Sequence, residues 1–176
     1  PCFVLDLTAT PKKESNIISY VDAVQLKNEH MVKLPVIVYN RDSQSEVLID
    51  AIDLRNKLEE IASAEYTKTG KYIRPIALFQ AQPKGKEDAT TFEKLRDKLV
   101  DKGIPAEQIA IRTADVNELK NTDLMSPSCP IRYIITVNAL KEGWDCPFAY
   151  ILASLANKTS QVDVEQILGR ILRLPH

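Results

Sequence analysis

Short apolar runs alternate with helical patterns along this chain, and the alternation limits the fold more than any other feature. The runs at 74–80, 108–112, 132–137 and 150–154 have the length and apolar interior of buried strands. A run at 34–39 has the same character, with a proline near its beginning. Strands that alternate with helices through short loops predict an α/β fold, with a mainly parallel sheet and helices on both faces.

Helices are expected where apolar residues recur at helical spacing. The strongest pattern covers 43–66, and two further helices are expected over 14–29 and 89–102. Residues 114–120 form a polar, weakly helical stretch. Right-handed crossovers between parallel strands bring the carboxyl ends of the strands to one edge of the sheet. That edge is where open α/β sheets bind ligands.

Composition narrows the class of protein further. The 176 residues, 44% of them hydrophobic, are enough for one well-buried domain. A net charge of −1 gives no bulk field that attracts nucleic acid, so any such contact depends on local clusters. Three scattered cysteines and two histidines predict reduced thiols and no metal site. No bilayer-spanning apolar run and no signal peptide pattern occurs, which predicts a cytoplasmic protein without a membrane partner.

The last part of the chain combines arginines with a strongly apolar helical pattern. A helix over 159–175 would place Gln166, Arg170 and Arg173 on one stripe. Arginine suits a bidentate grip on phosphate oxygens. Gly169 would cost about 1 kcal/mol relative to alanine in such a helix, which indicates a close approach to the backbone beside the first arginine. On these residues alone, a solvated charged face is an equally good interpretation.

Two motifs near the end of the chain carry a family resemblance. Asn138-Ala-Leu-Lys-Glu-Gly-Trp-Asp-Cys-Pro147 and Gln166-Ile-Leu-Gly-Arg-Ile-Leu-Arg173 resemble motifs V and VI of superfamily-2 helicases and translocases. The Glu-Gly-Trp-Asp sequence is most similar to the Res subunits of type III restriction enzymes. Thr8-Ala-Thr-Pro11 resembles motif III, although a simple turn is the better interpretation of those residues by themselves.

The resemblance implies a three-layer RecA-like fold and a division of the chain. Residues 1–12 would be the tail of the first helicase lobe, and 13–176 would be the second RecA-like lobe, truncated after motif VI. The chain has no Gly-x-x-x-x-Gly-Lys-Ser/Thr loop and no acidic box upstream of Thr8. ATP and Mg²⁺ would therefore be held mainly by the missing first lobe. The fragment alone is expected to bind neither of them and to be inactive.

The resemblance also implies roles for individual residues. Arg170 and Arg173 would act in catalysis as cations at the terminal phosphate, and Gln166 would orient them and the water. Three residues would lie at the nucleotide: Gly143, Asp145 and Gly169. The two glycines would allow the nucleotide to approach the backbone closely. Three more would couple the nucleotide to nucleic acid: Thr8, Thr10 and Lys141. No metal ligand is expected in this chain.

The leading hypothesis is the C-terminal motor lobe of an ATP-dependent DNA helicase or translocase, an NTP hydrolase similar to a type III restriction Res subunit. Its partners would be DNA, the first lobe and a modification methyltransferase subunit. One alternative is a non-catalytic scaffold lobe that binds DNA or protein. Another is the motor lobe of a type I restriction or DNA-repair helicase. A phosphate-binding loop and an acidic box upstream of Pro1 would favour a motor over a scaffold.

Overall fold

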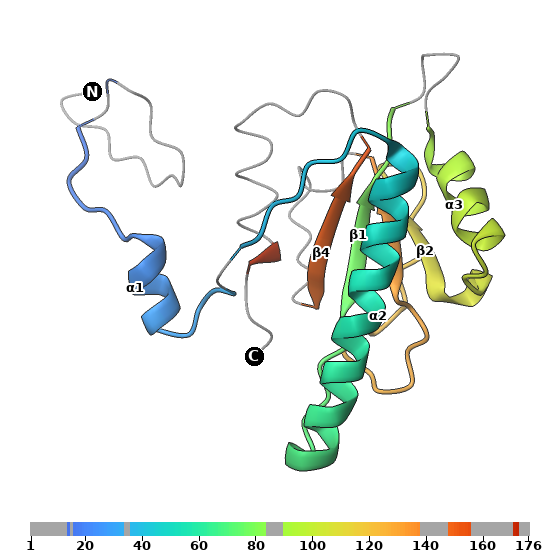
Figure 1. Ribbon diagram of the computed structural model, residues 1–176. Helices are drawn as coiled ribbons and strands as arrows, with labels where there is room; N and C mark the ends of the chain where they lie inside the picture. Colours follow the sequence, from blue (N-terminus) through green and yellow to red (C-terminus); the bar gives the residue numbers. More distant parts are fainter. Residues whose placement is uncertain are drawn as a thin grey trace.

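The computed structural model describes residues 14, 16–33, 36–83, 90–137, 148–155 and 171–172. Within them, four strands form an all-parallel sheet: β1 (Ile76–Gln80), β2 (Ile109–Arg112), β3 (Tyr133–Thr136) and β4 (Ala149–Ser154). The strand order is β2-β3-β1-β4, so β1 and β3 are central and β4 lies at one end (Figure 1). The α/β class and the parallel sheet are thus confirmed.

The described residues also contain three α-helices and one 3-10 helix: α1 (Ala23–Asn28), α2 (Gln44–Thr69), α3 (Phe92–Asp101) and η1 (Ala106–Gln108). Leu48 of α2 and Leu95 of α3 belong to the same core cluster as Phe79 of β1, so both helices cover one face of the sheet. The opposite face is covered by residues that precede β3 and by one residue near the end of the chain: Leu119, Cys129, Ile131 and Ile171.

Helix α2 has clear local start and stop signals. The Ser43 side chain accepts a hydrogen bond from the Glu46 amide at 3.2 Å, which caps the first turn. Gly70 ends the helix in the left-handed conformation, with φ 70°, and its amide donates to Tyr66 at 2.8 Å. The buried residues of α2 do not extend past Arg55, and its second half projects beyond the sheet (Figure 1).

Arg74 is buried where the chain enters β1, with 1% of its surface exposed. Its Nη1 donates to the Leu124 carbonyl at 2.5 Å, and its Nη2 donates to the carbonyls of Ser126 and Pro127 at 2.6 and 3.2 Å. Among the described residues its Nε has no partner. A single guanidinium therefore holds the segment before Cys129, which is a buried free thiol, against the sheet.

A second buried arginine joins α2 to the amino ends of the strands. Arg55 donates to the Pro75 carbonyl at 3.3 Å and forms an ion pair with Glu59 one turn further along α2. Glu59 also accepts from the Tyr72 hydroxyl at 2.5 Å. The Arg55 guanidinium lies 5.7 Å from the centre of the Tyr133 ring. These contacts satisfy charges that would otherwise be costly to bury.

Three expected elements differ from the structure. The helix expected over 14–29 is limited to α1, because Ile17, Ile18 and Val21 are exposed and have no surface to pack against. Residues 36–39 of the expected strand form no strand, and 34–35 lie outside the described residues. Residues 114–120 form turns instead of a weak helix.

The turns at 114–120 have a local cause. Asn117 forms an isolated antiparallel bridge with Arg112, so the chain folds back on the end of β2. The Glu118 carboxylate then accepts from the Ile111 amide at 2.7 Å and pairs with Arg96 of α3 at 3.0 Å. These tertiary contacts outweigh a weak helical tendency. In the segments that the structure describes, no helix is both long and apolar enough to cross a membrane.

Candidate functional site

The last residue of every strand is polar, and these four residues pair across the sheet. Arg112 pairs with Thr136, Thr136 with Gln80, and Gln80 with Ser154. Side chains alternate between the faces of a strand, so residues paired in register share a face. The four residues therefore form one polar line at the carboxyl edge, which we call the carboxyl-edge row. They lie on the face where Ile76, Leu78 and Ile134 are buried with Ile171.

Hydrogen bonds orient the middle of the carboxyl-edge row. The Ser154 hydroxyl donates to the Gln80 amide oxygen at 3.0 Å. No described residue accepts a hydrogen bond from the side-chain amide nitrogen of Gln80. Two N–H donors at the end of central strand β1 therefore have no acceptor among the described residues. Thr136 is fully buried, whereas Arg112 is half-buried and donates to the Thr113 carbonyl at 2.9 Å. The amide of Gln80 and the guanidinium of Arg112 are groups of the kind that bind sugar or phosphate oxygens.

A second polar cluster lies beside this edge, where β1 continues into its following loop. The Gln82 amide donates to the Thr90 carbonyl at 2.9 Å, and the Thr90 amide donates back to the Gln82 side chain at 2.8 Å. The Thr90 hydroxyl donates to the Gln44 side chain, in the first turn of α2, at 2.7 Å. These bonds join the described residues on either side of positions 84–89, where the sequence has Lys84 and Lys86.

All nine site residues predicted from the motifs lie outside the described residues: Thr8, Thr10, Lys141, Gly143, Asp145, Gln166, Gly169, Arg170 and Arg173. Their geometry is therefore not part of the structure described above, and their roles stay predictions. The structure does describe the residues from which two of the motif segments begin. Residues 138–147 follow β3 directly after Val137, and residues 156–170 follow β4 directly after Leu155.

Val137 and Leu155, after which these two segments begin, both lie at the carboxyl edge of the sheet. Strands β3 and β4 flank β1 on its two sides, so segments 138–147 and 156–170 begin on either side of Gln80. The chain returns to the described part at Ile171, which is 6% exposed and packs on the face that carries the carboxyl-edge row. The residue that follows Arg170 is thereby held against the sheet.

Sequence reasoning did not identify Gln80, Ser154, Gln44, Gln82 and Thr90 as site residues. A local signal exists for the first two, because each is the polar last residue of an apolar run. The cluster of Gln44, Gln82 and Thr90 has no such signal, since it depends on how α2 is placed over β1. No group of three or more His, Cys, Asp or Glu side chains within the described segments is suitable for a metal ion.

Among the described residues, the titratable groups with shifted pKa values are tyrosines outside the carboxyl-edge row. Burial raises the pKa of Tyr133, and the Arg55 guanidinium opposes that rise. Burial also raises the pKa of Tyr150. The pKa of Tyr72 is raised by burial first, and then by its hydrogen bond to Glu59. These hydroxyls remain protonated at neutral pH, so none of them is a general base there.

Comparison with known proteins gives no relative for this chain. No family model, curated protein or solved structure matches it. The assignment of a function therefore depends on the sequence motifs together with the geometry of the carboxyl edge.

Proposed function

We propose that this chain is the second RecA-like lobe of an ATP-dependent DNA helicase or translocase, similar to the Res subunit of type III restriction enzymes. One observation carries the proposal. The segment that resembles motif V starts directly after β3, and the segment 156–170, which contains Gln166, Gly169 and Arg170, starts directly after β4; β3 and β4 lie on either side of central strand β1. In open α/β sheets, ligands bind in the crevice outside the carboxyl ends of the strands. Both segments therefore start at the edge where this class of fold binds ligands. The second one rejoins the described chain at Ile171, beside the first residue of β4.

In this proposal the chain completes a nucleotide site whose phosphate-binding loop and Mg²⁺ ligands belong to a first lobe. Arg170 and Arg173 neutralise charge that develops on the terminal phosphate, and Gln166 orients the attacking water. Gly169 has no side chain, so the nucleotide can approach the backbone closely beside Arg170. Burial of Ile171 fixes the end of this segment, which reduces the reorganisation needed before phosphoryl transfer.

The remaining predicted residues lie in the other motifs. Gly143 and Asp145 contact the nucleotide, and Lys141 links the same segment to DNA, as Thr8 and Thr10 do from motif III. The carboxyl-edge row adds neutral hydrogen-bonding groups next to these segments. The partners would be duplex DNA and, in a type III system, a methyltransferase subunit in the cytoplasm.

The decisive experiment is steady-state ATP turnover by the polypeptide that joins this chain to its phosphate-binding lobe, with and without duplex DNA. Arg170→Ala and Arg173→Ala should each lower kcat by about 10³ or more, the contribution of a well-placed arginine in phosphoryl transfer. DNA binding, measured by fluorescence anisotropy, should change little. Turnover close to that of the unmodified protein in both variants would overturn the proposal.

Arg96→Ala is the matched control. Arg96 lies on α3 in a surface ion pair with Glu118 at 3.0 Å, and it is not part of any predicted motif. Its loss removes one guanidinium that belongs neither to the carboxyl-edge row nor to a predicted motif, so ATP turnover should not change. A protein that binds DNA but never hydrolyses ATP, even with the phosphate-binding lobe present, would support the scaffold alternative.

A further inference from the structure

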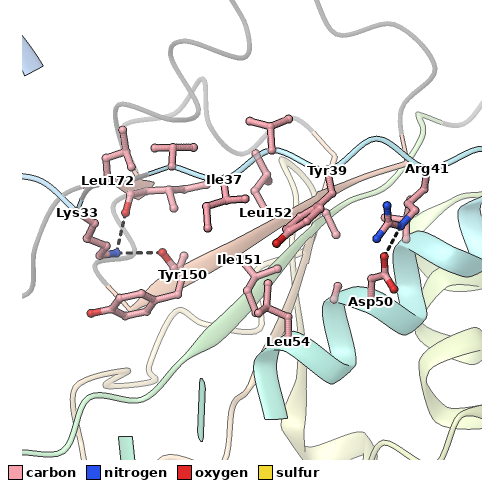
Figure 2. A pocket seen from close by; sticks show the side chains of 17 residues that line it. Lys33, Ile37, Tyr39, Arg41, Asp50, Leu54, Tyr150, Ile151, Leu152 and Leu172 are labelled. Atoms are coloured by element: carbon pink, nitrogen blue, oxygen red, sulfur yellow. Dashed lines mark hydrogen bonds and ion pairs between the residues drawn. The ribbon is translucent and has the colours of Figure 1, made fainter. Parts of the chain in front are cut away.

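Residues 36–41 form an extended segment alongside the outer edge of β4, and we call this segment the strap. A cavity of about 340 Å³ lies between the strap, β4 and the first turns of α2 (Figure 2). Its walls are mainly apolar and include Ile37 from the strap, Leu54 from α2 and Leu152 from β4. Among the described strands β4 pairs only with β1, so its other edge faces this cavity.

The chain is fastened to β4 just before the strap. The Lys33 amide donates to the Leu172 carbonyl at 2.5 Å. The Lys33 ammonium donates to the carbonyls of Ile171 and Ala149 at 2.7 and 3.0 Å, and it lies 4.3 Å from the centre of the Tyr150 ring (Figure 2). One lysine therefore ties the beginning of the strap both to the first residue of β4 and to residues 171–172.

The other end of the strap is fastened to α2. Arg41 forms an ion pair with Asp50, and its guanidinium lies 5.4 Å from the centre of the Tyr39 ring. Gln44 then donates to the Leu155 carbonyl, just beyond β4, at 3.5 Å. The strap thus runs parallel to β4. The chain from Lys33 to Gln44 contains more residues than the chain from Ala149 to Leu155 beside it, so the connection between the two anchors is longer than a straight strand requires.

Between these anchors the strap is poorly buried. The exposed fractions of its four apolar residues range from 41% to 83%: Val36, Ile37, Val38 and Tyr39. In the part of the chain that the structure describes, no backbone group of residues 36–40 bonds to β4. Two sets of backbone groups therefore face each other without pairing. Beta-branched and aromatic residues favour strands, and an unpaired strand edge is a template for another strand.

We propose that the strap closes onto β4 and pairs with it as a fifth parallel strand. Closure removes the strap side chains and the cavity walls from water together, which is favourable for apolar surface. It also gives partners to the backbone groups at the outer edge of β4. Because both ends of the strap are already held beside β4, closure costs less chain entropy than pairing of a free segment.

Closure has a consequence for the end of the chain. Lys33 bonds to the carbonyls of Ile171 and Leu172, so a displacement of these two residues weakens the anchor at Lys33, which keeps its contacts with Ala149 and Tyr150, and favours the open strap. The strap is thereby a device that responds to the position of residues 171–172. The device does not depend on nucleotide chemistry, and its test makes no use of ATP.

The test is amide hydrogen exchange, followed by NMR on the intact 176-residue chain. In a closed strap, alternate amides of residues 36–40 and the outward amides of β4 should exchange roughly tenfold more slowly than in a coil, the factor for a closed form in about tenfold excess. Coil-like exchange at every strap amide would overturn the proposal. This measurement needs no variant and is decisive even where a variant fails to fold.

Two adjacent proline substitutions provide the matched pair. Successive N–H groups of a strand point to opposite sides, and proline is tolerated in an edge strand where the N–H faces solvent. Of Ile37→Pro and Val38→Pro, one should therefore abolish the slow exchange in both the strap and β4. The other should leave it within about twofold of the unmodified chain. Equal effects of the two substitutions on the β4 amides would contradict strand pairing.

Discussion

Replacing Arg74 by methionine tests how much a single buried guanidinium contributes to this fold. Arg74 is 1% exposed and donates to three backbone carbonyls, those of Leu124, Ser126 and Pro127. Methionine keeps a long apolar side chain in the same space but donates no hydrogen bond. The substitution therefore removes the polar attachment of the 124–127 segment and leaves most of the packing.

The expected loss follows from the geometry. A hydrogen bond to a charged group contributes about 1.5–3 kcal/mol, so three bonds set an upper limit of about 4.5–9 kcal/mol. The real loss is smaller, because Leu124 and Ser126 are half-buried and Pro127 is exposed, so water reaches their carbonyls. Removing a buried charge also relieves its desolvation cost. We expect a net loss of about 3 kcal/mol in the free energy of unfolding.

Urea denaturation followed by far-UV circular dichroism measures this loss. For a chain of this size, about 3 kcal/mol corresponds to a fall in Tm of about 6–12 °C. Arg96→Met is the control, because the Arg96–Glu118 ion pair is about one-third exposed on both sides and should contribute less than about 1 kcal/mol. A change below about 0.5 kcal/mol in Arg74→Met, the usual range for surface substitutions, would refute the reasoning.

Three further predictions concern stability. Gly70→Ala should lower the free energy of unfolding by about 1 kcal/mol, because φ is +70° at this position. An added Cβ would meet no atom within 4 Å, so the loss comes from the backbone conformation alone. The urea midpoint measures this loss, and an unchanged midpoint would contradict the prediction. The contribution of the buried tyrosines to the free energy of unfolding should be full below about pH 10 and should decrease as the pH rises further, because burial raises the folded-state pKa of Tyr133 and Tyr150 above the unfolded value. Urea denaturation from pH 8 to 11 tests this prediction. In Tyr150→Phe the free energy of unfolding should decrease less over the same pH range. Thr90→Val should cost about 1 kcal/mol by removing the hydrogen bond to Gln44, and Thr90→Ser should restore most of it.

The strands and the two helices that pack on the sheet were predictable because their signals are local. Each of the four observed strands lies within two residues of its apolar run, and α2 and α3 follow their helical spacing closely. Leu95 and Leu99 are fully buried on one side of α3, as the spacing requires. Such residues need only a sheet to pack against, and any parallel α/β sheet supplies one.

The elements that sequence reasoning placed wrongly depend on partners far along the chain. Residues 36–39 have strand-forming side chains, but a strand also needs a neighbour with matching hydrogen bonds, and sequence alone does not supply one. Glu118 lies in turns because it bonds to Ile111 and Arg96, which local helical tendency cannot anticipate.

The candidate site was predictable only in its location. The carboxyl edge follows from the alternation of strands and helices, but the carboxyl-edge row requires the strand order and register. Nothing in the sequence indicates that Gln80 lies between Thr136 and Ser154. Likewise, the bond between Gln44 and Thr90 joins residues 46 positions apart. The nucleotide and DNA roles of the motif residues remain predictions that the ATP turnover experiment addresses.

The length of α2 has a mechanical consequence. A helix of 26 residues is about 39 Å long, and its buried residues end at Arg55. The part beyond Arg55 is about 21 Å long and extends past the sheet (Figure 1). A tilt of about 5° would move its tip by roughly 2 Å and would carry Tyr72 with it, because Glu59 and Tyr66 on this part of the helix both contact Tyr72.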